Sequence, residues 1–214
     1  GRTDTARQRG IYGRVDDVAF LRAVVRDLVD EGIALNSRVF LTGVSNGGMM
    51  SLRMGCEAAD LFAGIAPIIA NIPEDIASTC APSRPVPILL INGTADPLVP
   101  WDGGGVGFIG ARGRVISTME TIAFWRRING CSEEEKTLAL ATVSGNGTGV
   151  KGRLYDDCRS GAPVALISIE GGGHRIPGYE DRPHPVADWL LGLQNHDFET
   201  AEEVWRFFKT EASR

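Results

Sequence analysis

The sequence lacks a long apolar run and any surplus of positive charge. Its longest apolar segment covers residues 61–70, which is well short of the roughly 18 residues that a membrane-spanning helix needs. The 214 residues carry a net charge of −5, and the lysines and arginines are scattered, so the basic surface of a nucleic-acid-binding protein is missing. We therefore predict a chain with no membrane span and no nucleic-acid partner.

Cysteine is also scarce, with Cys56, Cys80, Cys131 and Cys158 as the only four. None of them has the C-x-x-C spacing of zinc or redox sites, and sequence alone permits three pairings. We favour Cys56 with Cys80 and Cys131 with Cys158, because each bridge would close a local excursion between strands. Free buried thiols are the alternative. Bridges would indicate an oxidising compartment, and we predict an extracellular protein, secreted or periplasmic.

The most informative stretch is residues 38–55. Its first residues form a short apolar, β-branched run typical of a strand, the glycines around Ser45 interrupt that run, and a helical pattern follows. A serine at such a turn lies at a helix N-terminus, where backbone N–H groups favour negative charge. We predict a nucleophile elbow with Ser45 at its apex. Gly43 and Gly47 would be glycine because a Cβ would clash across the turn.

Strands and helices alternate along the rest of the chain. Apolar runs at residues 62–68, 86–91 and 162–170 predict buried strands. A chain of this length predicts one domain, residues 1–214. The alternation predicts an α/β class protein with a doubly wound, mostly parallel sheet, whose functional groups gather at the carboxyl ends of the strands.

Capping patterns predict where two of the helices begin. Ser117 and Glu120 have the spacing of a capping box, and so do Thr200 and Glu203. Each pair precedes an amphipathic stretch. We therefore expect helices that begin at these two points.

Three polar residues follow predicted strands in the chain order Ser45, Asp96, His174. This is the order of the catalytic serine, acid and histidine in the α/β-hydrolases. Serine is a poor nucleophile until a base removes its proton, so His174 would act as base and Asp96 would orient its imidazole. The backbone N–H of Asn46 would be one oxyanion-hole donor. Trp101, in a glycine-rich loop that we place beside the site, would contact substrate.

Other residues compete for two of these roles. His184 lies between prolines and His196 precedes a helix, so both are interpreted as histidines of surface loops. Asp96 could instead be only an Asx-turn residue before Pro97. Its rivals as the acid are Asp102, Asp156 and Asp157.

Residues 15–22, 43–50, 92–100 and 170–178 together resemble the secreted polyhydroxybutyrate depolymerase and feruloyl esterase family of α/β-hydrolases. The resemblance implies Ser45, Asp96 and His174 as the catalytic residues, the same two disulfides, secretion, and no metal or organic cofactor. Members of that family have further strands before the first helix seen here, with a loop that supplies a second oxyanion donor. We therefore expect the C-terminal portion of the fold, apparently without its N-terminal strands.

These observations predict a serine carboxylic-ester hydrolase that acts through an acyl-enzyme. The ester substrate would be a polyester, or a feruloyl or acetyl ester of plant polysaccharide. A noncatalytic binding protein of the same fold is one alternative, and a peptidase of that fold is another. The oligomeric state is left open.

Overall fold

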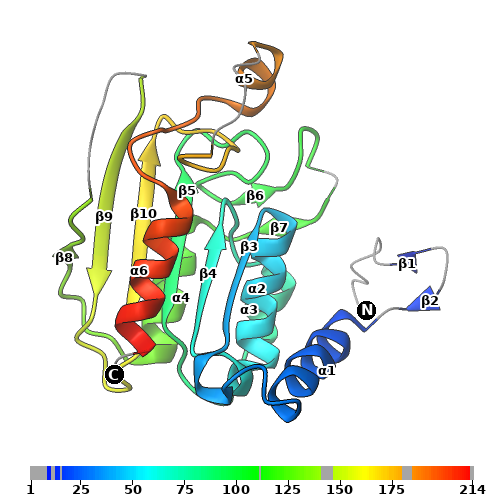
Figure 1. Ribbon diagram of the computed structural model, residues 1–214. Coiled ribbons are helices and arrows are strands. Elements are labelled where there is room, and N and C mark those ends of the chain that lie inside the picture. The colour runs from blue at the N-terminus through cyan, green and yellow to red at the C-terminus, as the bar shows by residue number, and fades with distance from the viewer. Residues whose placement is uncertain are drawn as a thin grey trace.

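Figure 1 shows the computed structural model, which describes residues 9–10, 13–14, 16–110, 112–140, 147–179 and 185–212. The strands are β1 (Arg9–Gly10), β2 (Gly13–Arg14), β3 (Phe40–Val44), β4 (Gly64–Ile68), β5 (Ile88–Gly93), β6 (Gly104–Gly105), β7 (Arg114–Val115), β8 (Lys136–Thr137), β9 (Gly149–Tyr155) and β10 (Val164–Glu170). The helices are α1 (Asp17–Asp30), α2 (Asn46–Glu57), α3 (Glu74–Thr79), α4 (Thr118–Asn129), α5 (Pro185–Leu191) and α6 (Thr200–Ala212), with short 3-10 turns at Asn36–Arg38 and Ala59–Leu61.

One six-stranded sheet forms the centre of the described chain, in the order β3-β4-β5-β10-β9-β8. The first four strands of this order are parallel, whereas β9 and β8 are antiparallel to their neighbours. The pairs β1–β2 and β6–β7 form two small antiparallel ladders. The predicted α/β class with a mostly parallel sheet is therefore confirmed.

Both faces of the central sheet are covered by helices (Figure 1). In β5, Ile88 and Leu90 pack into a cluster with residues of α1 to α4, while Leu89 and Ile91 pack on the other face with Val204 and Phe208 of α6. The alternation follows from the two-residue period of a strand. A strand buried on both faces must be apolar at every position, which is why residues 86–91 are continuously apolar.

Local sequence signals explain where several helices begin and end. The side chain of Asp16 accepts a hydrogen bond from Ala19 N–H and caps α1. Ser117 and Glu120 form the predicted capping box of α4, and Gly130 ends that helix in the left-handed conformation. In this capping box the Ser117 backbone N–H donates to the Glu120 carboxylate, and this hydrogen bond lowers the pKa of the carboxyl.

The second predicted capping box is wrong, although α6 does begin at Thr200. The hydroxyl of Thr200 donates to the carbonyl of Pro177, and the Glu203 carboxylate accepts from Arg206. Thr200 therefore ties the helix to a preceding loop. A tertiary contact therefore takes the Thr200 hydroxyl, and the Glu203 carboxylate pairs with Arg206 within the same helix.

Two disulfides join Cys56 to Cys80 and Cys131 to Cys158, which are the predicted pairings. The first connects the last turn of α2 to the end of α3, and the second connects the segment after α4 to the segment after β9. Among the described residues, no helix is long and apolar enough to cross a membrane.

Candidate active site

Ser45 lies at a sharp turn between β3 and α2. Its backbone has φ 55° and ψ −115°, a conformation that costs a non-glycine residue energy and that the surrounding structure must impose. The N–H of Ser45 donates to Ile68 at the end of β4, and its carbonyl accepts from Met49 in the first turn of α2. The side chain is half-buried. The hydroxyl is thus fixed at the carboxyl edge of the sheet.

Close backbone approach explains only one of the two flanking glycines. A Cβ on Gly43 would lie 2.2 Å from the carbonyl oxygen of Gly47, whereas a Cβ on Gly47 would meet nothing within 4 Å. The second crowded position is Gly48, whose added Cβ would lie 2.6 Å from the Cβ of Ala70. The prediction of a clash is therefore right for Gly43 and wrong for Gly47.

Ser45, His174 and Asp96 are joined by two side-chain hydrogen bonds. Ser45 Oγ lies 2.9 Å from His174 Nε2, and His174 Nδ1 lies 2.7 Å from Asp96 Oδ2. An ionised carboxylate can only accept, so Nδ1 carries the proton and Nε2 is free to accept from the serine hydroxyl. The imidazole is 11% exposed and the carboxylate 2%. The three side chains therefore form one chain of hydrogen bonds that is largely screened from solvent.

Asp96 uses its two carboxylate oxygens differently. Oδ2 bonds to His174, while Oδ1 accepts from the backbone N–H groups of Leu98 and Val99, each at 2.8 Å. From the sequence, Asp96 was either an Asx-turn residue or the residue that orients His174. Both occur together, because the turn orients the oxygen that faces the imidazole.

The loop that carries His174 is held on two sides. Its Gly172 carbonyl accepts from Ala95 N–H in the loop of the acid, and His174 N–H donates to Leu191. A Cβ on Gly173 would lie 2.0 Å from the Leu191 carbonyl oxygen. The run of glycines before the histidine therefore allows two backbones to approach each other.

Comparisons with known proteins identify the fold. The family model described as phospholipase/carboxylesterase matches residues 13–105. Acetyl xylan esterase from Aspergillus awamori has a similar fold, with a TM-score of 0.54 at 15% identity over 90% of this chain and 67% of that chain. The chain has the α/β-hydrolase fold. The predicted α/β-hydrolase fold is thus confirmed.

Two sequence relatives refine the position of this α/β-hydrolase. A protein of Nocardia uniformis subsp. tsuyamanensis named "Putative esterase NocK" is 34% identical over 198 residues, which are 89% of this chain and 56% of that protein. Feruloyl esterase B of Piromyces equi is 33% identical over 164 residues, 74% of this chain and 29% of that protein. The chain therefore spans about half of the first relative and less than a third of the second. The predicted resemblance to feruloyl esterases is confirmed.

Beneath the triad, this α/β-hydrolase has a buried polar cluster that sequence reasoning missed. The Asn92 amide donates to the Ala70 carbonyl, Asn71 Oδ1 and Thr118 Oγ1, and its Oδ1 accepts from Ala70 N–H. Asn71 in turn donates to Pro100 in the loop after Asp96. Asn71 directly follows the apolar run at residues 61–70 and Asn92 the run at residues 86–91, which is the signal that could have identified them.

A second strained residue lies next to this cluster in the chain. Ile69, directly after β4, has φ 45° and is buried. Its N–H donates to Ile91 in β5. Since the carbonyl of Ile68 accepts from Ser45 N–H, the strained segment adjoins the elbow, and Asn92 holds the backbone of the next residue, Ala70.

Two further predicted site residues lie near these loops. Asn46 is the first residue of α2, so its backbone N–H has no acceptor within the helix and is available to a ligand. Trp101 is half-buried against the main core, and its carbonyl accepts from Thr118 N–H. Its ring is therefore only partly available to a substrate.

The rival residues occupy other environments. His196 is exposed, as predicted, while His184 lies outside the described residues. Asp102 is exposed, and Asp156 pairs with Lys136 at 2.8 Å. Asp157 is exposed on the segment after β9. Within the described parts of the chain, no group of three or more His, Cys, Asp or Glu side chains could hold a metal ion.

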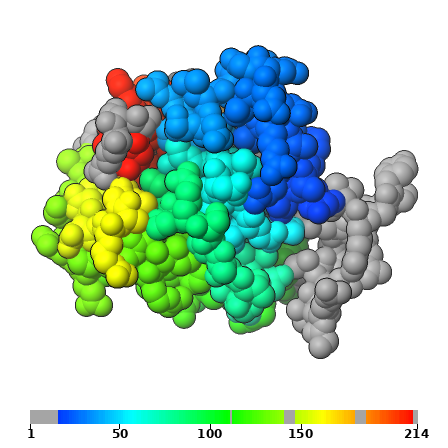
Figure 2. Space-filling view, turned by 90° about the horizontal axis from the view of Figure 1, so that it is seen from below, coloured from blue at the N-terminus to red at the C-terminus, as the bar shows by residue number. Residues whose placement is uncertain are grey.

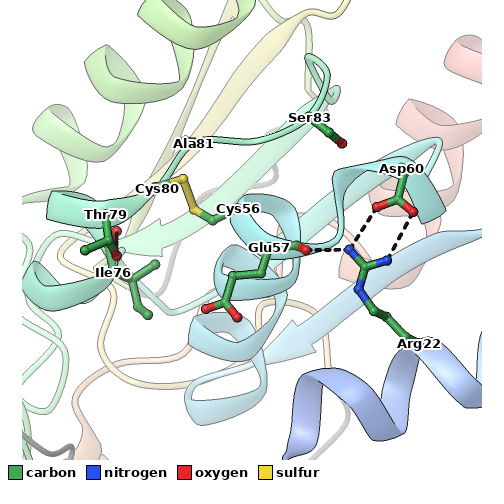
Figure 3. A pocket seen from close by; sticks show the side chains of 9 residues that line it. All are labelled: Arg22, Cys56, Glu57, Asp60, Ile76, Thr79, Cys80, Ala81 and Ser83. Atoms are coloured by element: carbon green, nitrogen blue, oxygen red, sulfur yellow. Dashed lines mark hydrogen bonds and ion pairs between the residues drawn. A yellow bond between two sulfur atoms is a disulfide. The ribbon is translucent and has the colours of Figure 1, made fainter.

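A pocket of about 450 Å³ lies at the other end of α2 (Figure 3). It is lined by the Cys56–Cys80 disulfide and by Arg22, whose guanidinium bonds to both carboxylate oxygens of Asp60 and to the Glu57 carbonyl. Burial of Asp60 is the largest single influence and opposes its ionisation, but the hydrogen bonds and the positive charge of Arg22, with smaller contributions from a backbone hydrogen bond and Arg26, together lower the pKa of the carboxyl. Because α2 is 12 residues long, this pocket lies roughly 15 Å or more from Ser45.

Proposed function

We propose that this α/β-hydrolase is a serine carboxylic-ester hydrolase that works through an acyl-enzyme. The observation that carries the proposal is the unbroken relay from Ser45 Oγ through His174 to Asp96. Activation by an adjacent base is what a serine hydroxyl needs to attack a carbonyl. The names of the relatives, esterases in each case, support the same class of reaction.

In the proposed acylation, Ser45 Oγ forms a bond to the ester carbonyl carbon while its proton passes to His174 Nε2. The oxygen that becomes negative is stabilised by the Asn46 N–H at the start of α2, where the helix dipole also favours negative charge. The C–O bond to the alcohol then breaks, and His174 gives the proton to the leaving oxygen. Asp96 keeps the imidazole oriented and stabilises its charged form.

Deacylation repeats these steps with water as the nucleophile. His174 takes a proton from the water, whose oxygen bonds to the acyl carbon, and then returns that proton to Ser45 as the acid leaves. The acyl group is therefore transferred first to the protein and then to water. No other reactant is required.

We propose a feruloyl or acetyl ester of plant polysaccharide, or a polyester, as the substrate. Feruloyl esterase B of Piromyces equi and Feruloyl esterase C of Emericella nidulans, the latter 27% identical over 175 residues, support the first class. Trp101 would contribute to this choice. The two disulfides support an extracellular location, because such bonds persist in oxidising compartments.

A fluorophosphonate probe tests the mechanism without knowledge of the substrate. We expect peptide mass spectrometry to locate the adduct on Ser45 in the wild type, and labelling to fall at least about a hundredfold in His174→Ala. His196→Ala is the matched control, because His196 is exposed and lies outside the Ser45–His174–Asp96 chain of hydrogen bonds, and it should label like the wild type. A folded protein that is not labelled would contradict the proposal and favour a noncatalytic binding protein.

Substrate class is tested on the same preparation. Release of acid from methyl ferulate, acetylated xylan and poly(3-hydroxybutyrate) would be compared with release of amine from a peptide anilide. We expect turnover of at least one ester and its loss in Ser45→Ala. Hydrolysis of the anilide in preference to every ester would instead indicate a peptidase.

A further inference from the structure

A second pocket, of about 480 Å³, lies at the C-terminal end of α4. Two of its arginines, Arg126 and Arg127, belong to the last turn of that helix, and Arg159 comes from the segment between β9 and β10. Its lining residues are Arg126, Arg127, Gly130, Cys131, Ser132, Asp157, Cys158 and Arg159.

This pocket is far from the proposed catalytic residues. It adjoins the amino end of β10, whereas His174 follows the carboxyl end of the same strand, and β10 has seven residues. At about 3.3 Å per residue the two sites are roughly 20 Å apart. Figure 2 looks onto this end of the molecule, where the lime-green end of α4 adjoins the yellow segment after β9.

The walls of the pocket are fixed by covalent and backbone contacts. The Cys131–Cys158 disulfide joins the two segments that form it. Arg159 N–H donates to Gly130 at 3.1 Å, and Ser132 N–H donates to Asp157 at 2.8 Å. A ligand would therefore meet a preformed site and would not have to order the backbone.

Among the described residues, the arginines of this pocket have no carboxylate partner. Arg22, Arg53 and Arg114 each form an ion pair with an acidic residue. Within the described residues, no ion pair within 4.0 Å involves Arg126, Arg127 or Arg159, and none involves Asp157. Three positive charges and the one negative charge of Asp157 thus line a pocket in a chain whose net charge is negative.

The helix end accounts for only part of this cluster. Cations are favoured near a helix C-terminus, which suits Arg126 and Arg127. Arg126 also lies 4.3 Å from the centre of the Tyr155 ring and donates to the Ser132 carbonyl, so it serves as a wall of the pocket. Neither reason applies to Arg159. Arg127 and Arg159 are exposed and keep their guanidinium donors available.

We propose that this pocket binds a small oxyanion between Arg127 and Arg159. A guanidinium presents a planar fork of N–H donors that matches two oxygens of a carboxylate, sulfate or phosphate. The Ser132 hydroxyl accepts from Glu134 N–H and keeps its own proton to donate. The anion is either inorganic sulfate or phosphate, or the carboxylate of an acidic sugar. This binding does not depend on the proposed esterase reaction.

Isothermal titration calorimetry of the purified chain with sodium sulfate, sodium phosphate and galacturonate tests the proposal. Binding is measured directly, and not as a rise in Tm, because sulfate stabilises many proteins without binding them, through its exclusion from their surface. We expect at least one anion to bind with a Kd of about 1 mM or below. Arg127→Ala/Arg159→Ala should weaken that binding at least tenfold. Tightest binding of galacturonate would identify a sugar carboxylate, and tightest binding of sulfate or phosphate would identify an inorganic anion.

The matched control is Arg114→Ala/Arg206→Ala, which removes two positive charges elsewhere on the surface. It should bind the anion like the wild type. Equal weakening in both double variants would attribute the effect to net charge and overturn the proposal. Failure of all three anions to bind below about 10 mM would overturn it as well. The Ser45→Ala variant should bind normally, so the result is separate from the outcome for catalysis.

Discussion

Replacement of Gly43 by alanine should damage both the stability and the activity of this α/β-hydrolase. The added Cβ would lie 2.2 Å from Gly47 O and 2.3 Å from Gly47 C, more than 1 Å inside the roughly 3.5–4.0 Å of a favourable contact. Both atoms belong to backbone, so no rotamer change can relieve the overlap. The elbow must open instead.

Overpacking of this kind costs about 1–3 kcal/mol, and a clash with backbone belongs at the upper end. For a chain of this size, about 3 kcal/mol lowers Tm by roughly 6–12 °C. Displacement of Ser45 by about 1 Å should lower the rate of ester hydrolysis roughly a hundredfold. Differential scanning calorimetry and hydrolysis of 4-nitrophenyl acetate measure the two effects.

Gly47→Ala is the control for this prediction, since its Cβ would meet nothing within 4 Å. Gly47 lies in α2, where alanine is favoured over glycine by about 0.5–1 kcal/mol. We therefore expect Tm to stay the same or rise by a few degrees. Equal losses of Tm in the two variants, or an unchanged Tm in Gly43→Ala, would refute the argument from close approach.

Two other substitutions test interactions beneath and beyond the site. Asn92→Leu leaves buried partners such as the Ala70 N–H without a hydrogen bond and should lower the urea unfolding free energy by about 3–5 kcal/mol; a loss under 1 kcal/mol would contradict it. Arg22→Gln should lower stability at pH 7 by under about 1 kcal/mol. Because the pKa of Asp60 is lowered in the folded chain, this contribution is present above its ordinary value and is lost as pH falls through the folded pKa. Urea unfolding should therefore show a smaller deficit at pH 3 than at pH 7, and an equal deficit would exclude Asp60 as the cause.

The parts of the fold that sequence predicted are those set by local patterns. The elbow around Ser45 could be predicted because a strand pattern, a glycine turn and a helix pattern follow one another directly. The capping box of Ser117 and Glu120 needs only residues three positions apart. The order Ser45, Asp96, His174 then placed three side chains at one edge, because parallel strands share their carboxyl end.

The missed features depend on partners distant in the chain. Asn92 bonds to Asn71, 21 positions away, and Thr118 bonds to Asn71 across 47 positions, and no periodicity encodes such contacts. The prediction that Thr200 caps α6 was wrong for the same reason, since the Thr200 hydroxyl donates to the carbonyl of Pro177, 23 positions earlier in the chain. Gly47 resembled Gly43 in sequence because a motif records a residue type and leaves out the direction in which its Cβ would point.

The relay at the site joins residues that are 129 and 78 positions apart. Three strands of the parallel sheet carry these residues, and closing such long loops is a slow part of folding. During refolding, secondary structure can therefore return while Ser45 and His174 are still apart. Recovered reactivity of the Ser45 hydroxyl would therefore show that strands β3, β4, β5 and β10 have paired in their native order. Its rate of recovery would measure how fast the parallel part of the sheet assembles.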